Sequence, residues 1–392
     1  MRPLIILFVD NKKRDLLAMT YLAENFEMNG ISTLLIPWNI RLSLFKTIID
    51  SLKPQAVLFP HARTTAEHIF DFLSTKQTQV FIHDTEGWMY RRRIVSYLNN
   101  EFTSKIVTRC AGYFVWGEDF AERIKGKFGS NCKLTVSGSV RLEAFSRLKE
   151  FRQPSNKKLL VATTCEKPYP RFQSASSELK LFVRDLGYSL DDYLKEYNVQ
   201  LKNQERLFTT TSKIRSLYPD LKIAIRPHPF ASLDAISECL TEYGIDAELS
   251  LEMASYEDLM DTTVLLHGGS TISLEAYALG IPSITSSSLL GIPKELMDHQ
   301  GFTTYAEDLI DVNNKLAEII KTPEKYIIEN KSDSPYLREI GKEPSPSSII
   351  TKIIKDRIAD SPKSSRSLSN LKLGIPDFSR PNALGGYLSK YK

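Results

Sequence analysis

The chain has 392 residues, enough for roughly two domains, and its 42% hydrophobic and 25% charged residues are typical of a soluble folded protein rather than a disordered one. Its 51 basic and 47 acidic residues leave a formal net charge of +4, too balanced to indicate a nucleic-acid partner. The four cysteines lie far apart without histidines at metal-ligand spacing. This spacing argues against a zinc site and predicts reduced thiols in a cytoplasmic protein.

Strands and helices are predicted to alternate along the first 150 residues. The apolar run Leu4–Val9 ends at Asp10 and is too short for a signal-peptide core or a membrane span, so it predicts a buried strand. Further apolar runs predict strands at residues 33–36, 56–59, 80–82, 113–116 and 133–136. Helical periodicity predicts helices at residues 14–28 and 42–52 and from Glu118 onward. Such alternation predicts a parallel sheet covered on both faces, in a first domain over residues 1–150.

A second α/β series follows the polar stretch "KEFRQPSNKK", which has the composition of a connector. Strands are predicted at residues 159–162, 223–225, 264–266 and 283–285, with helices at 204–217, 233–243 and 272–279. We therefore expect a second Rossmann-like domain over residues 158–345, then a helix and a basic tail over 346–392. The sequence leaves open whether the tail from residue 361 is loose or packs on the first domain. Two doubly wound halves predict a ligand site in the cleft between them.

The first candidate site is "FIHDTEGWMYRRR", which begins inside a predicted strand. Asp84 and Glu86 follow that strand directly, and Gly87 permits a turn after them. Carboxylates at the carboxyl end of a parallel strand lie where α/β proteins bind ligands, so either can serve as a general base. A helix cap with surface charge is the alternative interpretation.

The second candidate site combines "IRPHPFASLD" with "ATTCEKPYPRF". Arg226 and His228 follow a predicted strand, and Pro227 and Pro229 restrict the backbone around the histidine. A rigid imidazole beside an arginine suits phosphate binding or protonation of a leaving group. Glu166 follows the first strand of the second half and is expected to face the cleft as an acid or base, with simple surface solvation as the alternative.

The third candidate site is "LLHGGSTISLEAYALGIPSIT". An apolar strand ends near His267, and a helix is predicted after a turn of small residues, namely Gly268, Gly269, Ser270 and Thr271. Free backbone N–H groups at such a turn suit an anion, most often a phosphate. Glu275, one turn into the helix, suits ribose hydroxyls or acts as a favourable charge near the positive helix end. No G-x-S-x-G, G-x-x-x-x-G-K-[ST] or G-x-G-x-x-G motif is placed to support a hydrolase, P-loop or dinucleotide site.

In this order the motifs resemble the bacterial surface-carbohydrate biosynthesis proteins, GT-B glycosyltransferases related to the retaining β-Kdo transferases. The resemblance covers most of residues 4–285. It rests on "FVDNKKRDLLAMTYLAENFEMNG", "HDTEG", "YFVWGEDFAERIKGKF" with "VSGSVRLEAF", "RPHP" and "HGGSTISLEAYALGIPSI". The acidic-Gly motif combined with the His-Pro motif also looks like bacterial sialyltransferases, which use CMP-activated 2-keto sugar acids. Here Thr85 separates Asp84 from Glu86, where the family commonly has two adjacent acids.

The resemblance implies an α/β GT-B fold whose two Rossmann-like domains face a cleft, with the acceptor glycan of lipopolysaccharide or capsule on the first domain. CMP-Kdo would be the donor, held by Arg226, His228 and Pro229 near the nucleotide and by the 268–271 turn near phosphate. No metal or other cofactor is expected. Retention implies a carboxylate-linked intermediate, for which Asp234 and Glu166 are the candidate nucleophile and acid/base.

Other functions stay open at the level of sequence. The donor can instead be an NDP-hexose or CDP-glycerol, or the protein can be a non-catalytic nucleotide or glycan binder in an assembly complex. The basic, aromatic end "GGYLSKYK" suits contact with an anionic inner-membrane surface that carries lipid-linked acceptors, where each lysine contributes only about 1 kcal/mol. We therefore expect a cytoplasmic protein, with peripheral membrane association as an open alternative.

Overall fold

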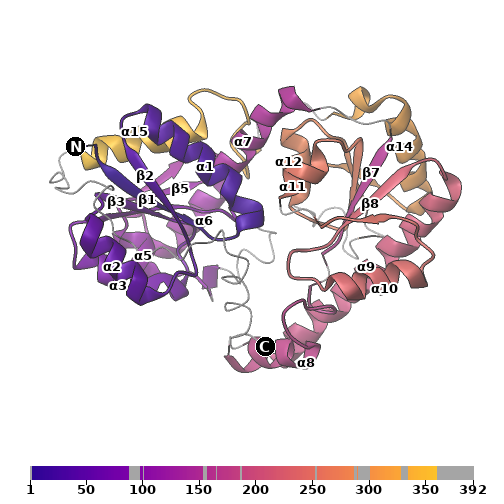
Figure 1. Cartoon of the computed structure of the whole chain (residues 1–392), viewed down its shortest axis with the longest axis horizontal. Coiled ribbons are helices and arrows are strands. Elements are labelled where there is room, and N and C mark those ends of the chain that lie inside the picture. The colour runs from indigo at the N-terminus through magenta and orange to yellow at the C-terminus, as the bar shows by residue number, and fades with distance from the viewer. Residues whose placement is uncertain are drawn as a thin grey trace, which may run out of the picture.

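Two α/β domains lie side by side, and each is built on a six-stranded parallel sheet with helices on both faces (Figure 1). The computed structural model describes residues 2–87, 98–99, 101–152, 157–164, 166–185, 188–251, 254–286, 289, 301–327 and 334–359. This arrangement confirms the predicted fold class, two Rossmann-like domains that face each other. No helix among the described residues is long and apolar enough to cross a membrane.

The first sheet has the strand order β2-β1-β3-β4-β5-β6. Its strands are β1 (Leu4–Val9), β2 (Ser32–Pro37), β3 (Ala56–Phe59), β4 (Gln79–His83), β5 (Gly112–Val115) and β6 (Leu134–Val136). Its helices are α1 (Lys12–Met28), α2 (Leu42–Leu52), η1 (Thr64–Ala66), α3 (Glu67–Ser74), α5 (Ser104–Arg109), α6 (Glu118–Phe128), α7 (Val140–Leu148) and η2 (Lys149–Phe151). The strand order reverses between β1 and β3, so a ligand crevice is expected at their carboxyl ends.

The second sheet has the order β12-β11-β10-β7-β8-β9. Its strands are β7 (Lys158–Ala162), β8 (Lys222–Arg226), β9 (Glu248–Leu249), β10 (Val264–His267), β11 (Ser283–Ser286) and β12 (Thr304–Ala306). Its helices are α8 (Ala175–Lys180), the π-helical η3 (Leu181–Asp185), α9 (Leu190–Leu217), α10 (Leu233–Glu242), α11 (Ser255–Leu259), α12 (Ile272–Ala278), α14 (Leu309–Lys321) and η5 (Pro323–Tyr326). The reversal here lies between β7 and β10, the strand that leads into the glycine turn.

Strand β1 shows why the first sheet is buried on both faces. Its six residues are all apolar, and successive side chains of a strand point to opposite faces. Ile6 and Phe8 accordingly pack in one hydrophobic cluster with α2 and α3, whereas Ile5 and Leu7 pack in another with α1. A continuous apolar run of this kind is what a parallel sheet between two helix layers requires.

The chain returns to the first domain after the second one is complete. Helix α15 (Pro346–Ile358) lies beside α1 in Figure 1, and its residues Ile350, Ile354 and Ile358 join the hydrophobic cluster that contains Ile5 and Val140. Its first turn is fixed by the buried Glu143 of α7, whose carboxylate accepts hydrogen bonds from the backbone N and the Oγ of Ser347, both at 2.8 Å. The predicted basic tail, including residues 385–392, lies outside the described residues.

The two domains share a packed interface at α7 and α12. Trp116 and Phe145 from the first domain and Leu274 from the second belong to one hydrophobic cluster. Beside it, the buried Arg141 of α7 pairs with the buried Glu275 of α12 at 3.4 Å. This contact holds the domains together on one side of the cleft. The carboxyl ends of the strands in both sheets lie on the other side and form the walls of the cleft.

Candidate functional site

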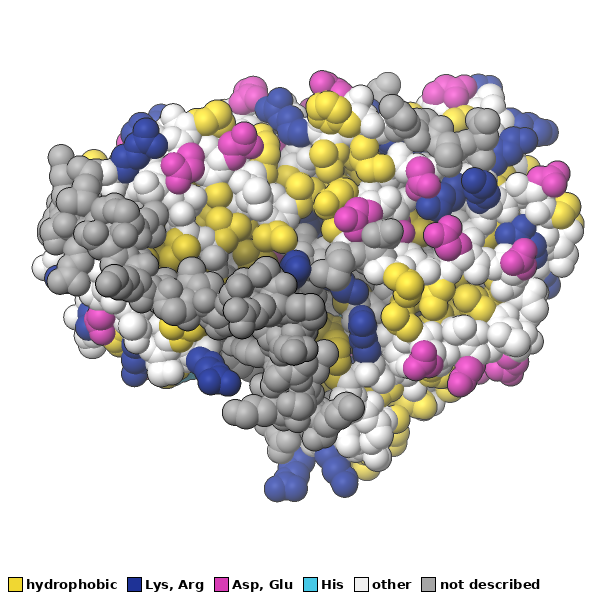
Figure 2. Space-filling view, in the orientation of Figure 1, with side chains coloured by type: hydrophobic (Ala, Val, Ile, Leu, Met, Phe, Trp, Pro, Cys, Tyr) yellow, Lys and Arg dark blue, Asp and Glu magenta, His cyan; other side chains and the backbone are white. Residues whose placement is uncertain are grey.

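A cavity of about 280 Å³ lies between the domains at the carboxyl end of β8. Lys13, from the start of α1, is its contribution from the first domain. The second domain contributes Arg171, Arg226, Pro227, His228, Pro229, Leu233, Ser250 and Leu251. Figure 2 shows Lys and Arg side chains in the seam between the two domains, with hydrophobic side chains on either side. The structure thus brings Arg226, His228 and Pro229 together in one cavity.

Positive charge dominates the walls of this cavity. Arg226 pairs with the buried Asp258, which also accepts a hydrogen bond from the Oγ of Ser250 at 2.7 Å. Within the described part of the chain, neither Lys13 nor Arg171 has a carboxylate within ion-pair distance. Burial, together with the nearby charges of Arg171 and Arg226, lowers the pKa of Lys13. A cavity with this charge suits an anionic ligand.

His228 and Glu166 meet at the edge of the cavity. The Nδ1 of His228 lies 3.6 Å from the Oε2 of Glu166, and both side chains are about one quarter to one third exposed. The backbone N–H of His228 donates to the Oγ1 of Thr163 at 3.2 Å, and the backbone N–H of Phe230 donates to Nδ1 at 3.4 Å. An Nδ1 that accepts a hydrogen bond places the proton of a neutral imidazole on Nε2.

Lys167 anchors the loop that carries Glu166, a role that sequence reasoning missed. Its Nζ lies 4.8 Å from the ring centre of Phe182, 5.2 Å from that of Tyr193 and 5.7 Å from that of Tyr188. It also pairs with Glu196 of α9. Cation–π contacts from three rings stabilise a buried ammonium group strongly.

Gln200 of α9 completes the support of this loop. Its Nε2 donates to Glu166 at 3.0 Å, and its Oε1 accepts the backbone N–H of Lys167 at 3.0 Å. No local sequence pattern connects residues 166–167 with α9. The contact exists because α9 is a 28-residue helix whose first half reaches this loop.

The glycine turn after β10 is held from inside the protein. His267 is fully buried, its Nδ1 accepts the backbone N–H of Gly269 at 3.1 Å, and its Nε2 lies 3.1 Å from the Oγ1 of Thr303. Gly269 has φ +94°, a conformation that side-chain-bearing residues rarely adopt. Ser270 and Thr271 are partly exposed, whereas Gly268 and Gly269 are buried.

This turn does not line the 280 Å³ cavity but lies near it. In the pairing register, Ala162 of β7 aligns with Arg226 on one side and with His267 on the other. Two strand spacings therefore separate Arg226 from His267, a distance of about 10 Å. The side chain of Glu275 is buried one turn beyond, and its Oε2 has no hydrogen-bond partner among the described residues.

Glu86 is the partly exposed acid of the HDTEG motif, and two arginines hold it. It pairs with Arg14 of α1 and with Arg63, which follows β3. Arg14 also reaches Asp10 at 2.9 Å and Asp15 at 2.8 Å, so three carboxylates surround one guanidinium. Burial is the main cause of a raised pKa of Asp10. The carboxyl ends of β1, β3 and β4 thus form one charged cluster in the first domain.

Asp84 orders the turn that presents Glu86. Its side chain is completely buried, accepting hydrogen bonds from the hydroxyl of Tyr113 at 2.8 Å and from the backbone N–H of Glu86 at 2.9 Å. Burial raises the pKa of Asp84 to about 6. The indole N–H of Trp116 donates to the backbone carbonyl of Asp84 at 2.7 Å, and a Cβ on Gly87 would lie 2.5 Å from the indole ring. The motif needs its glycine because the tryptophan occupies that space.

Asp234 lies in the first turn of α10, where Ser232 caps the helix. Its side chain is exposed and does not line the cavity, although its neighbour Leu233 does. A carboxylate in this position also interacts favourably with the positive end of the helix. The structure therefore brings Glu166 to His228, whereas Asp234 lies outside that pair.

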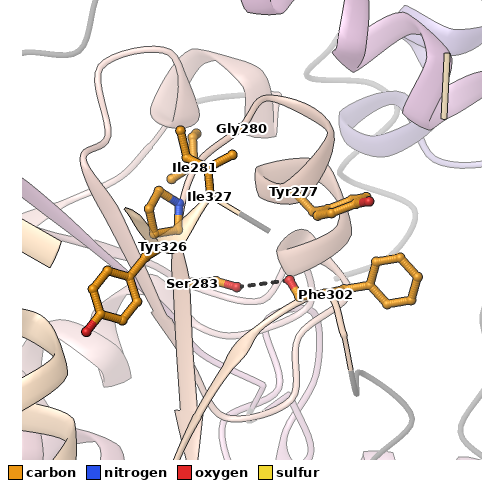
Figure 3. A pocket seen from close by; sticks show the side chains of 8 residues that line it. Tyr277, Gly280, Ile281, Ser283, Phe302, Tyr326 and Ile327 are labelled. Atoms are coloured by element: carbon orange, nitrogen blue, oxygen red, sulfur yellow. Dashed lines mark hydrogen bonds between the residues drawn. The ribbon is translucent and has the colours of Figure 1, made fainter. Parts of the chain in front are cut away.

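A second, much smaller pocket lies in the second domain at the amino end of β11, so it is at the opposite ends of the strands from the first cavity. It has room for about one water molecule, with a volume near 10 Å³. Figure 3 shows Tyr277, Ile281, Tyr326 and Phe302 around it, with the hydroxyl of Ser283 donating to the carbonyl of Phe302 at 3.4 Å. Its position at the amino end of the strand separates it from the charged edges of the sheets.

The three cysteines that the structure describes do not take part in either charged cluster. Cys110, Cys132 and Cys239 are buried and unpaired, and burial raises the pKa of Cys110 to about 12; Cys165 lies outside the described residues. Among the residues that the structure describes, no group of three His, Cys, Asp or Glu side chains is arranged to hold a metal ion.

The two facing Rossmann-like domains, with charged residues at the carboxyl edges of both sheets, define a GT-B fold. Sequence comparison finds no matching family model and no matching curated protein.

Solved structures match over nearly the whole chain. A Listeria monocytogenes protein assigned as a UDP-N-acetylglucosamine 2-epimerase has a TM-score of 0.62 and 11% identity, covering 94% of this chain and 100% of its own. MnaA of S. aureus in complex with UDP has a TM-score of 0.57 and 14% identity, covering 93% and 100%. A variant of the wall teichoic acid polymerase TagF has a TM-score of 0.51 and 14% identity, covering 91% and 89%. These likenesses show the fold.

Proposed function

We propose that the protein is a GT-B glycosyltransferase that transfers Kdo, or a related 2-keto sugar acid, from its CMP-activated form to a surface glycan of lipopolysaccharide or capsule. The observation that carries this proposal is the cationic cavity at the carboxyl end of β8, where Arg226 lies beside His228 and the His228–Glu166 pair forms the edge. Such a cavity offers both an anion site and a proton donor at one place.

The second domain is proposed to bind the donor. Arg226, His228 and Pro229 contact the nucleotide, and Gly268, Gly269, Ser270 and Thr271 lie near its phosphate, about 10 Å from Arg226. Glu275 is proposed to accept a hydrogen bond from a ribose hydroxyl, supported by an Oε2 that has no hydrogen-bond partner among the described residues. No metal is required by this arrangement, because side chains and backbone N–H groups supply the positive charge that a leaving phosphate needs.

A double displacement would retain the configuration of the sugar. A carboxylate oxygen, from Glu166 or Asp234, forms a bond to the anomeric carbon while the bond to the phosphate oxygen breaks. His228 donates a proton to the departing CMP through Nε2. The acceptor hydroxyl then attacks the anomeric carbon, gives its proton to a base and releases the carboxylate. The 3.6 Å contact between His228 and Glu166 favours Glu166 over Asp234 as the carboxylate that acts together with His228.

The first domain is proposed to bind the acceptor. Glu86 projects from the edge of the first sheet between Arg14 and Arg63 and is the candidate base for the acceptor hydroxyl. Asp84 is proposed to assist by holding the turn, since both of its oxygens accept hydrogen bonds from protein groups.

A UDP-linked donor is the second candidate. The fold of the chain is similar to that of MnaA, whose structure contains UDP, and a cationic cavity suits a diphosphate as well as a monophosphate. CDP-glycerol and a purely binding role remain further alternatives that the same assays separate.

The test is transfer from CMP-Kdo by the full chain in the absence of added metal. His228→Ala should abolish turnover, whereas His68→Ala, which removes an exposed histidine of α3, should not. Full activity of His228→Ala would contradict the proposed site. Turnover with a UDP-sugar but not with CMP-Kdo would replace the donor while keeping the site.

A further inference from the structure

Two cations in the cavity have no role in the proposed chemistry. Lys13 comes from the first domain and Arg171 from the loop after β7, and within the described residues neither forms an ion pair. Like charges that lie close together on the wall of a cavity repel each other, and a negative charge between them is favourable. Burial is the main cause of the lowered pKa of Lys13, and the nearby positive charges of Arg171 and Arg226 lower it further.

The contrast with its neighbour shows that Lys13 is directed across the cleft. Arg14, one residue later on α1, pairs with carboxylates of the first domain, namely Asp10, Asp15 and Glu86. Lys13 instead lies on the wall of a cavity that is otherwise built by the second domain. Its backbone N–H is already used, because it donates to the Oδ1 of the helix-capping Asn11 at 2.9 Å. The ammonium group of the side chain is therefore the hydrogen-bond donor that Lys13 can offer to a ligand in the cavity.

The charges on the other wall are only partly balanced. Asp258 neutralises Arg226, and its second partner is the hydroxyl of Ser250. Arg171 is exposed, and its backbone N–H donates to the carbonyl of Phe230 at 2.8 Å. This hydrogen bond fixes the loop of Arg171 beside residues 227–230, called here the His-Pro corner. The Arg171 guanidinium lies 5.5 Å from the ring centre of Phe172, but neither it nor Lys13 has a carboxylate partner among the described residues.

We propose that Lys13 and Arg171 form an anion subsite that spans the cleft and binds a phosphate or carboxylate group of the donor. The inference rests on the proposed function, and it adds that the donor is held by both domains. Binding of the donor then ties α1 of the first domain to the His-Pro corner of the second.

The test is calorimetric titration of the full chain with nucleoside and nucleotide pairs: cytidine and CMP, and uridine and UDP. Lys13→Gln should weaken nucleotide binding by about tenfold or more and leave nucleoside binding unchanged, because only the nucleotide carries the anion. Arg171→Gln should act in the same direction. Lys12→Gln removes an exposed lysine of the same helix turn and should change neither.

The outcomes separate this inference from the proposed donor. An effect of Lys13→Gln that appears with CMP itself identifies phosphate as the bound group, and one that appears only with CMP-Kdo identifies the carboxylate. A preference for UDP with the Lys13 effect preserved rejects the CMP donor and keeps the subsite. CMP-Kdo is therefore titrated alongside the nucleotides. Equal affinities of wild type and Lys13→Gln for CMP, UDP and CMP-Kdo, an equal loss in Lys12→Gln, or no binding of any of the three would overturn the subsite.

Discussion

The carboxyl group of Asp84 should make the free energy of unfolding decrease as the pH rises from about 4 to about 6. Burial raises its pKa from 3.8 to about 6, so the folded protein binds this proton more tightly than the unfolded chain does. The folded state therefore holds more protons between pH 4 and pH 6, and stability falls as the pH rises through this range. A difference of about two pKa units corresponds to about 3 kcal/mol of unfolding free energy lost above pH 6.

Asp84→Asn removes the ionisation and keeps the shape. The amide oxygen can accept the backbone N–H of Glu86, and the amide nitrogen can donate to the hydroxyl of Tyr113, so both contacts of the carboxylate have a replacement. The stability of wild type relative to the variant should consequently fall by up to about 3 kcal/mol between pH 4 and pH 6.5 and stay constant above that pH.

Urea unfolding of both proteins at several pH values from 4 to 7.5 measures this difference. Buried His61 and His83, whose pKa values burial lowers to about 3 and about 4, produce the opposite dependence. They act equally in both proteins and cancel in the comparison. Asp246→Asn, which removes an exposed carboxyl, is the matched control. A difference between wild type and Asp84→Asn that does not vary with pH would refute the reasoning.

Three further predictions concern packing and positioning. Gly87→Ala should lower the free energy of unfolding by about 1–3 kcal/mol, because its Cβ would lie 2.5 Å from an indole ring; urea midpoints equal to wild type would contradict this. Arg141→Met should lower the free energy of unfolding by about 3–5 kcal/mol, because it leaves Glu275 buried without its cation. Thermal unfolding of the double variant with Glu275→Leu should show that most of this loss is recovered. Lys167→Met should lower kcat and alter the pH profile of transfer with little change in KM, since it loosens the loop of Glu166; an unchanged profile would argue against this role.

The predicted strands of both sheets match the structure to within a residue or two, because most of them are short apolar runs bounded by polar residues, proline or glycine. Strands β9 and β12 were not predicted, since they have only two and three residues and lie at the sheet edges. The first half of α9 was also missed. Its exposed apolar residues, such as Leu190 and Leu194, do not repeat on a buried face.

The residues of the candidate site were predictable only where they follow strands. Arg226 and Glu86 belong to this group, because the carboxyl ends of parallel strands share one edge. Lys13 and Lys167 do not, since their partners lie on other elements or in the other domain. The pairing of Arg141 with Glu275 likewise depends on how α7 meets α12, which no local pattern encodes.

The most direct measurement of the central claim is a crystal structure of the full chain with CMP bound. We expect the nucleotide in the cavity between the domains, in contact with Arg226 and His228, with its phosphate near the 268–271 turn and its ribose near Glu275. A nucleotide bound elsewhere, with this cavity unchanged, would contradict the account.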